Sequence, residues 1–382
     1  MSSVIRNEQT EQEYTRARDK VVKKISSPTT FGAADSGSIP TATKITKTPN
    51  RATAKALEED ILAPRFYTTN FEKLNKLILD SHKAEFEQML GEFREDKNKG
   101  HFVPTLEFKQ DFPDLPREEF EEFLRRSCLG EFSGCLLYRE ISDNSTNPIL
   151  KNTFHYITRD EGRHASFLTH TMKDLGIEFD LGFLAKSKKR TSIPPKIMFY
   201  TVYLSEIIGY WRYITIYNQL EAHPEYRFHP IFKWFGRWCE DEHRHGHFFA
   251  TLMKSQSKQV LQGRLNHALI RFFTLSVYMT MFLRDAQPAS ASLYGKMGLD
   301  PRQYDLDVIK MCDDEASTVW GFKFQVGHPT FVRQLDLMAV NNRKLNALKG
   351  KTGPRARLQR MAVKANNVAR IARLFVMPTI KV

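Results

Sequence analysis

The chain has 382 residues, of which 41% are hydrophobic, so it can form one large domain or two ordinary ones with a sizeable core. Its formal net charge of +13 favours an anionic partner: nucleic acid, an anionic lipid surface or an acidic protein. No stretch reaches the roughly 18 consecutive apolar residues that a spanning helix needs. We expect no secretory signal and no transit peptide. The four cysteines lack a Cys-x-x-Cys pair, which favours small buried thiols in a reducing compartment.

Composition predicts three segments. Residues 1–62 are rich in Ser, Thr and Lys without a sustained apolar period, and we expect a mobile N-terminal extension. Residues 63–340 are expected to form one helical domain, and residues 341–382 a basic tail. The last forty residues contain eleven Lys or Arg and no Asp or Glu.

Within the tail, apolar residues recur at spacings of three and four, which predicts a basic amphipathic helix over 358–376. These residues are Leu358, Met361, Ala365, Val368, Ala372 and Phe375. Such a helix can lie on an anionic membrane surface or on an acidic partner, or it can pack loosely on the rest of the protein.

Apolar periodicity and capping residues predict an all-α fold. A first helix is expected over 71–93, ahead of a connection that is punctuated by prolines. The core helices are expected at 116–141, 147–175, 194–221, 229–255 and 264–284, with a further helical segment at 304–324. The clearest helix start is Asn147-Pro148, an N-cap followed by proline at the first helical position.

A short motif occurs twice in this helical region. Residues 160–164 read Asp-Glu-Gly-Arg-His, and residues 241–245 read Asp-Glu-His-Arg-His. Residues three apart share a helix face, so each copy directs a carboxylate and an imidazole the same way. Helical bundles that hold two iron ions use two such Glu-x-x-His units and one further Glu from each of two other helices.

The two further carboxylates are expected to be Glu131 and Glu206. Each is a lone acid among small or apolar neighbours, and each precedes the Glu of one motif copy at a distance that suits an antiparallel helix pair. Burying a carboxylate costs several kcal/mol unless it is compensated, and a metal ion is the strongest compensation. Glu140 is an alternative to Glu131, which we prefer for its spacing and surroundings.

Six residues are therefore candidate metal ligands and catalytic residues: Glu131, Glu161, His164, Glu206, Glu242 and His245. In this hypothesis Glu161 and Glu242 bridge the metals, and the other four residues are terminal ligands. A set rich in carboxylates suits iron or manganese better than structural zinc. On the second helix of the motif pair, His243 and His247 are alternatives to His245, and the pair Glu240 and His243 also has the required spacing.

Four residues within the repeat are expected to support the ligands. Asp160 and Asp241 can each accept the remaining N–H of the imidazole on the opposite helix. Arg163 and Arg244 can then neutralise these aspartates. A site of this kind activates O2 and can drive the oxidation of unactivated C–H bonds.

The motifs resemble a known family over about residues 65–335. The segments that carry the resemblance are Gly130–Gly134, Arg159–Phe167, Leu181–Leu184, Tyr203–Tyr217 and Arg227–Gly246. They resemble the aerobic magnesium-protoporphyrin IX monomethyl ester oxidative cyclases, di-iron enzymes of chlorophyll and bacteriochlorophyll synthesis. The resemblance implies a ferritin-like helical bundle in which 63–340 is the catalytic domain, and it places the family's iron ligands on the same six residues.

The resemblance also implies the reaction and its partners. The family forms the isocyclic ring of the pigment in O2-dependent steps, converting Mg-protoporphyrin IX 13-monomethyl ester to divinyl protochlorophyllide. Electrons come from NADPH through ferredoxin, and a small accessory subunit is often needed. The implied location is peripheral, on the cytoplasmic or stromal side of a photosynthetic membrane, either a thylakoid or a bacterial intracytoplasmic membrane.

Two further expectations concern the substrate and the electron donor. A flat porphyrin needs an aromatic-lined cavity, for which the candidates are Tyr210, Trp211, Tyr213 and Tyr217. The basic run 186–190 is a candidate docking patch for an acidic ferredoxin. Rival readings are another ferritin-like di-iron oxidase or iron-storage protein, and a non-catalytic membrane scaffold for pigment enzymes. We expect no nucleic-acid partner, because no nucleic-acid-binding module is recognisable.

Overall fold

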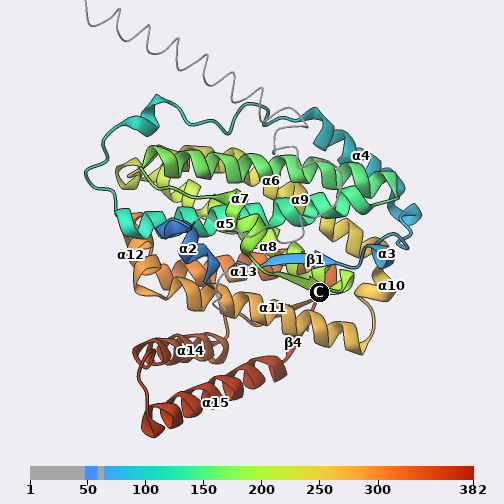
Figure 1. Ribbon diagram of the computed structural model, residues 1–382. Coiled ribbons are helices and arrows are strands. Elements are labelled where there is room, and N and C mark those ends of the chain that lie inside the picture. The colour runs from blue at the N-terminus through green and yellow to red at the C-terminus, as the bar shows by residue number, and fades with distance from the viewer. Residues whose placement is uncertain (1–47, 59–63) are drawn as a thin grey trace, which may run out of the picture. The chain divides into compact units, whose positions relative to one another are not determined.

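The computed structural model describes residues 48–58 and 64–382, and these divide into two compact units. Unit 1 comprises the described residues up to 76 together with 84–193 and 227–238, and unit 2 comprises 77–83, 194–226 and 239–382. The described chain is mainly helical, and its strands form two short two-stranded ladders. The predicted all-α class is therefore confirmed (Figure 1). None of the described helices has both the length and the apolar character needed to cross a membrane.

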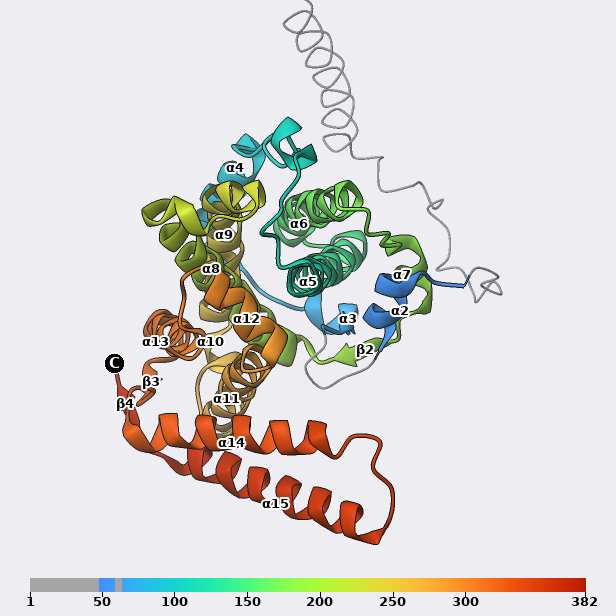
Figure 2. The ribbon, with the colours of Figure 1, turned by 90° about the vertical axis from the view of Figure 1, so that its left-hand side faces the viewer.

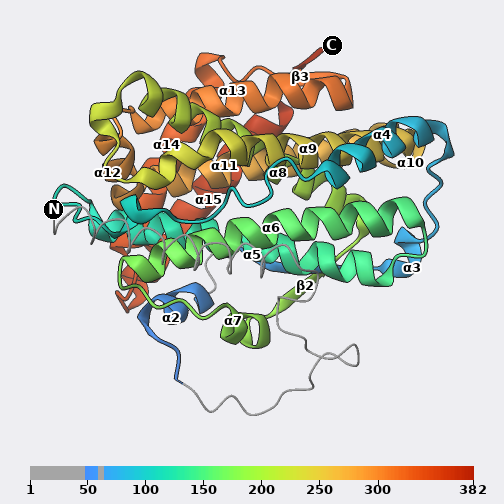
Figure 3. The ribbon, with the colours of Figure 1, turned by 90° about the horizontal axis from the view of Figure 1, so that it is seen from above.

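Unit 1 is built on two long helices, α5 (Arg117–Asn144) and α6 (Pro148–Asp174), which lie side by side along their length (Figures 1 and 3). The N-cap predicted for α6 is present, because Asn147 Oδ1 accepts the N–H groups of Ile149 at 2.9 Å and Leu150 at 3.3 Å. The helix ends before Gly176, whose φ of 72° lies in the left-handed region. Both helices match the predicted ranges closely.

A parallel ladder joins two distant segments of unit 1. β1 (Phe66–Thr69) pairs with β2 (Arg190–Ile193), which follows α7 (Leu181–Ser187). Thr69 Oγ1 also donates to the carbonyl of Ile193 at 2.9 Å. These strands have four residues each, which is too short for a periodicity signal in the sequence.

The expected N-terminal extension needs revision where it can be described. Residues 1–47 and 59–63 lie outside the described residues, but α2 (Arg51–Leu57) falls inside the expected mobile segment and is packed. Lys188 Nζ donates to the carbonyl of Ala56 at 2.9 Å, and Arg51 pairs with Glu121 at 2.6 Å. The short helix gains its stability from these long-range contacts, so its own seven residues do not reveal it.

The single helix predicted over 71–93 is wrong. α3 (Phe71–Leu74) ends early, and α4 (Lys83–Glu95) begins after a 3₁₀ turn. The break follows Asn75, which donates to the carbonyl of Asn144 at 2.9 Å and accepts the N–H of Thr146 at 3.0 Å. A side chain bonded to a distant turn competes with helix continuation.

Unit 2 contains α8 (Pro195–Ala222), most of α9 (Phe235–Ser255), α11 (Arg264–Asp285) and α13 (Pro301–Trp320). α9 is preceded by a 3₁₀ turn over Pro230–Trp234, so the helix predicted from residue 229 starts later. The short helices α10 and α12 span Ser257–Val260 and Pro288–Lys296.

The helix predicted over 304–324 stops at Trp320. Gly321 adopts a φ of 74°, and β3 (Phe322–Phe324) then pairs antiparallel with β4 (Thr379–Lys381). α14 (Pro329–Ala347) runs through the expected tail boundary at 340, and α15 (Pro354–Val376) returns alongside it (Figure 2). The basic tail is therefore half of a helical hairpin within unit 2.

All four cysteines are buried and free, as predicted. Cys128 and Cys135 lie on α5, on either side of Glu131. Burial raises the pKa of each of these two thiols to about 12. Cys128 contacts the carbonyl oxygen of Ala165 on α6 at 3.5 Å, so it is part of the packing between the two helices.

Candidate metal-binding residues

Three of the predicted ligands form one cluster in unit 1. This first cluster consists of Glu131 on α5 and Glu161 and His164 on α6, whose potential ligand atoms lie within 4.8 Å of one another. His164 Nδ1 is 3.1 Å from Glu131 Oε2. All three residues are buried or nearly so. Buried acids beside a buried imidazole form a donor set for a cation.

Aromatic side chains hold the imidazole of the first cluster. The ring of Trp238 stacks on His164 with centroids 4.3 Å apart, and Phe102 meets the same ring edge-on at 4.8 Å. These contacts leave the imidazole little freedom to rotate, so they help to direct Nδ1 towards Glu131. Neither Phe102 nor the stacking of Trp238 on His164 was predicted from the sequence.

The other three predicted ligands form a matching cluster in unit 2. This second cluster consists of Glu206 on α8 and Glu242 and His245 on α9, again with potential ligand atoms within 4.8 Å of one another. His245 Nδ1 is 3.3 Å from Glu206 Oε2. In both clusters the same ring nitrogen faces the lone Glu, so the repeat in the sequence is also a repeat in local geometry.

A glycine accompanies each cluster at the same position. Gly134 and Gly209 lie three residues after Glu131 and Glu206, so the sequence contains a second repeat, Glu-x-x-Gly, that our sequence reading missed. A Cβ on Gly134 would lie 3.3 Å from Glu161 Oε2, and a Cβ on Gly209 would lie 3.1 Å from Glu242 Oε2. Each missing side chain gives the neighbouring carboxylate room.

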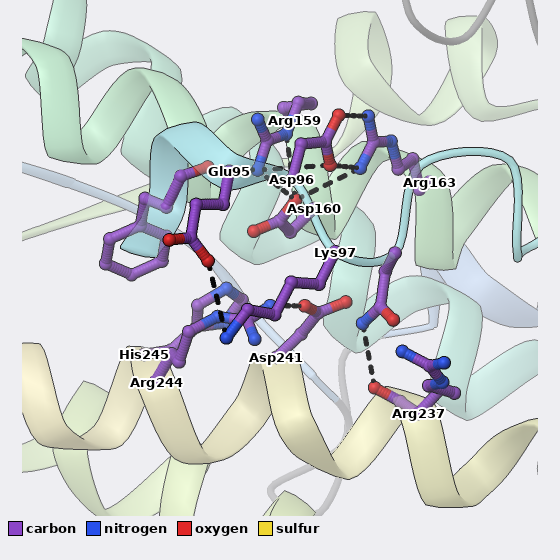
Figure 4. Close-up of polar contacts among 12 residues, drawn as sticks. Glu95, Asp96, Lys97, Arg159, Asp160, Arg163, Arg237, Asp241, Arg244 and His245 are labelled. Atoms are coloured by element: carbon purple, nitrogen blue, oxygen red, sulfur yellow. Dashed lines mark hydrogen bonds and ion pairs between the residues drawn. The ribbon is translucent and has the colours of Figure 1, made fainter. Parts of the chain in front are cut away.

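Charged residues behind the first cluster are arranged around Asp96 (Figure 4). Arg163 donates to both carboxylate oxygens of Asp96, and Arg159 Nη2 lies 3.5 Å from the same residue. Asp160 accepts from Arg159 at 2.9 Å and lies 3.5 Å from Arg163. Asp160, the predicted partner of Arg163, therefore shares this arginine with Asp96. Asp96 follows α4 and has a φ of 54°. It belongs to no motif, so the sequence did not predict its role.

The second cluster shows the simpler arrangement that the sequence predicted, since Arg244 donates to Asp241 one helical turn away (Figure 4). The predicted acceptance of imidazole N–H groups by Asp160 and Asp241 stays a prediction.

The alternative ligands lie elsewhere. Glu240, His243 and His247 are exposed on α9, whereas Glu242 and His245 are buried. Glu140 is half-buried and forms an ion pair with Arg190 of β2. Burial thus separates the preferred residues from their neighbours of the same type.

The four aromatic pocket candidates lie on α8 in different surroundings. Trp211 donates from Nε1 to Glu315 Oε2 of α13 at 2.6 Å, which fixes it within unit 2. The ring of Tyr210 contacts His243 with centroids 5.4 Å apart. Tyr213 is buried and Tyr217 is half-buried. Their role as a porphyrin pocket stays a prediction.

The basic run at 186–190 is not the uniform docking patch that was expected. Lys188 is buried and donates a hydrogen bond to the carbonyl oxygen of Ala56, and Arg190 is paired with Glu140. Lys186 and Lys189 are the exposed cations of this run.

The donor atoms of both clusters fit iron. Each cluster offers two carboxylates and one imidazole nitrogen, a mixed oxygen and nitrogen set that suits iron, and contains no thiol. Cys128 and Cys135 are on the same helix as Glu131, but burial keeps both thiols protonated, which disfavours them as ligands.

The helical fold and the two clusters indicate a ferritin-like protein, and a match to a known family supports this class. The Rubrerythrin family model matches residues 122–253, the segment that contains all six candidate ligands, so this part of the chain is ferritin-like. No solved structure matches the chain.

Relatives narrow the class to one family. The magnesium-protoporphyrin IX monomethyl ester [oxidative] cyclase of Cyanidioschyzon merolae is 47% identical over 73% of this chain and 84% of its own length. The Synechococcus elongatus protein of the same name is 46% identical over 78% and 84%. The chloroplastic Euphorbia esula protein of that name is 42% identical over 89% and 86%. The chain belongs to this oxidative cyclase family.

Proposed function

We propose that this chain catalyses the O2-dependent oxidative cyclisation of Mg-protoporphyrin IX 13-monomethyl ester to divinyl protochlorophyllide. The observation that carries the proposal is the pair of matching clusters, each with two carboxylates and an imidazole, in a chain that belongs to the oxidative cyclase family. Membership favours this reaction over that of another ferritin-like oxidase or a non-catalytic scaffold.

The proposal assigns two irons to the six residues of the two clusters. When bound, the iron pair supplies the activation of O2 for oxidation of the substrate side chain. Glu131 and Glu206 would each hold an iron through a carboxylate, His164 and His245 would each give one nitrogen, and Glu161 and Glu242 would be the shared carboxylate ligands. This completes the set of four Glu and two His that ferritin-like di-iron proteins use.

Neighbouring residues hold the candidate ligands in place within each cluster. Stacking on Trp238 holds the His164 ring, so Nδ1 is presented without a loss of rotamer freedom on binding. Gly134 and Gly209 leave room beside the carboxylates of Glu161 and Glu242, which would let these carboxylates adjust when a metal binds. Arg159 and Arg163 pair with Asp160 and also with Asp96, so two cations offset two carboxylates and help to keep Asp160 in place.

Further parts of the proposal concern partners. We assign reduction to NADPH through ferredoxin, with Lys186 and Lys189 as the exposed cations that would meet an acidic donor. Tyr210, Trp211, Tyr213 and Tyr217 are the proposed porphyrin contacts. A small accessory subunit and a peripheral location on a photosynthetic membrane complete the proposal, and the net charge of +13 suits such a surface.

The test is an in vitro assay with the Mg-porphyrin ester, O2, NADPH and ferredoxin, read by product absorbance, together with iron analysis. The wild type should bind two irons per chain, whereas Glu161→Ala and His245→Ala should lose iron and turnover. Glu240→Ala is the matched control, because Glu240 is an exposed acid on the same helix as Glu242. Full turnover by either ligand variant would refute the site.

A further inference from the structure

Polar side chains of α15 contact α14. Asn341 of α14 donates to the side-chain oxygens of Asn366 at 2.9 Å and Asn367 at 2.7 Å. One turn on, Arg370 donates to Gln334 of α14 at 3.0 Å. Two amides and a guanidinium of α15 therefore take part in the contact between the two helices. An amphipathic helix that packs within a domain normally turns its apolar face inward.

The apolar face of α15 points the other way. We define the α15 stripe as Leu358, Met361, Ala365, Val368 and Ala372, which recur at spacings of three and four and so share one face. Leu358 is 68% exposed, Met361 59% and Val368 66%, and both alanines are exposed as well. The buried residues of this helix are Ala356 and Leu374, which belong to the opposite face.

Cations border the stripe on both sides. Arg357 and Lys364 are seven residues apart along one edge, and Arg355 and Arg373 are eighteen apart along the other, and all four are exposed. The sequence contains no Asp or Glu after Asp336. The surface is thus apolar in the middle and positive at its edges, without an acid to offset it.

The helix is fixed at both ends. Near its start, Arg360 donates to the carbonyls of Leu348 at 3.1 Å and Lys351 at 2.7 Å. At its end, Arg271 of α11 donates to the carbonyl of Met377 at 2.6 Å. The stripe is therefore displayed on a rigid helix, and a partner need not order it first.

We propose that the α15 stripe docks on an anionic lipid surface, with its apolar side chains among the acyl chains and its cations against the headgroups. An apolar band flanked by Lys and Arg is the pattern of helices that lie in a membrane interface. A second copy of the chain would bring the same cations to the contact and be repelled. An acidic protein would match the cations but would not require a continuous apolar band. The inference deepens the proposed membrane location and rests on it.

The test uses the full chain in co-sedimentation with vesicles of phosphatidylglycerol or of phosphatidylcholine. The wild type should bind the phosphatidylglycerol vesicles and should be released as salt is raised. The triple variant Leu358→Ser/Met361→Gln/Val368→Ser should lose roughly tenfold or more in vesicle affinity. Arg357→Gln/Lys364→Gln should lose a similar amount and show a weaker salt dependence. Ile78→Ser, which changes an apolar side chain that is 69% exposed outside α15, is the matched control.

Iron content and the thermal melt check that each variant is folded, and the double charge variant keeps the test decisive if the triple variant does not fold. Equal binding by wild type and the α15 variants would overturn the docking surface while leaving a membrane location intact. Absence of wild-type binding to either vesicle would overturn both. A wild-type dimer that the triple variant converts to a monomer, with no vesicle binding, would assign the stripe to self-association instead. Cyclase turnover, measured separately, tests the catalytic proposal.

Discussion

The two glycines beside the clusters lead to a graded prediction for iron affinity. An alanine Cβ at position 209 would lie 3.1 Å from Glu242 Oε2, whereas ordinary contact begins at 3.4 Å, so the carboxylate would have to move by about 0.3 Å. At position 134 the Cβ would lie 3.3 Å from both Glu161 Oε2 and Tyr138 Cε2, so each of these side chains would have to move by only about 0.1 Å. At Gly130, an exposed glycine of the same helix as Gly134, a Cβ would meet nothing within 4 Å.

Protein–metal distances hold to within about ±0.2 Å, so the first displacement exceeds this tolerance and the second does not. We therefore expect Gly209→Ala to weaken Fe(II) binding roughly tenfold, as disturbing ligand orientation commonly does. Gly134→Ala should have a smaller effect and Gly130→Ala none. Folding stability should respond less, because the helix propensity gained from alanine, up to about 1 kcal/mol, offsets much of the crowding.

The assay is anaerobic titration of the apoprotein with Fe(II) for each variant, paired with denaturant unfolding of the apoprotein. Gly130→Ala should be as stable as the wild type or up to about 1 kcal/mol more stable, with unchanged iron affinity. The reasoning is refuted if Gly209→Ala binds iron as tightly as Gly130→Ala does.

Three further predictions concern buried charge. Asp96→Asn keeps a residue that tolerates a φ of 54° but removes the main counter-charge of buried Arg163, so the free energy of unfolding should fall by about 2 kcal/mol, while exposed Asp111→Asn should change little. Arg212→Met leaves Asp285 in unit 2 without its closest cation and should cost about 3 kcal/mol in denaturant unfolding; a cost below 1 kcal/mol would count against the buried pair. Burial lowers the pKa of His229 to about 3, so the unfolded state binds more protons below pH 6.5 and stability should fall by about 1.4 kcal/mol per pH unit from this residue. His229→Asn, which can still cap the turn at Ile231, should flatten that part of the stability profile between pH 6.5 and 3; an unchanged acid slope would show that His229 does not titrate there.

Sequence reasoning succeeded where local chemistry decides the structure. Asn147-Pro148 predicted the start of α6 because both the cap and the proline act within one turn. Helix periodicity places residues three apart on one face, which is why the residues of each Glu-x-x-His unit were expected to lie together, and in the structure they do. Their role as metal ligands stays a prediction.

The features that the sequence did not predict depend on residues that are distant along the chain. The break after α3 depends on Asn75 reaching a turn near residue 145, and α2 is held by side chains more than sixty residues away. Asp96 carries no motif, and its role follows from where Arg163 lies. The periodicity of α15 showed that the helix has an apolar face, but only the exposure of Leu358, Met361 and Val368 in the structure shows that this face is turned outward.

The buried cysteines have a consequence for a protein that is proposed to handle O2. Oxidation of a thiol proceeds through its thiolate, and burial raises the pKa of the thiol in all four cysteines. At neutral pH nearly all of these sulfur atoms therefore carry a proton and react slowly with oxidants. The four buried thiols therefore fill space in the interior but are poor reductants. Oxidants that escape from the proposed site would react with them only slowly.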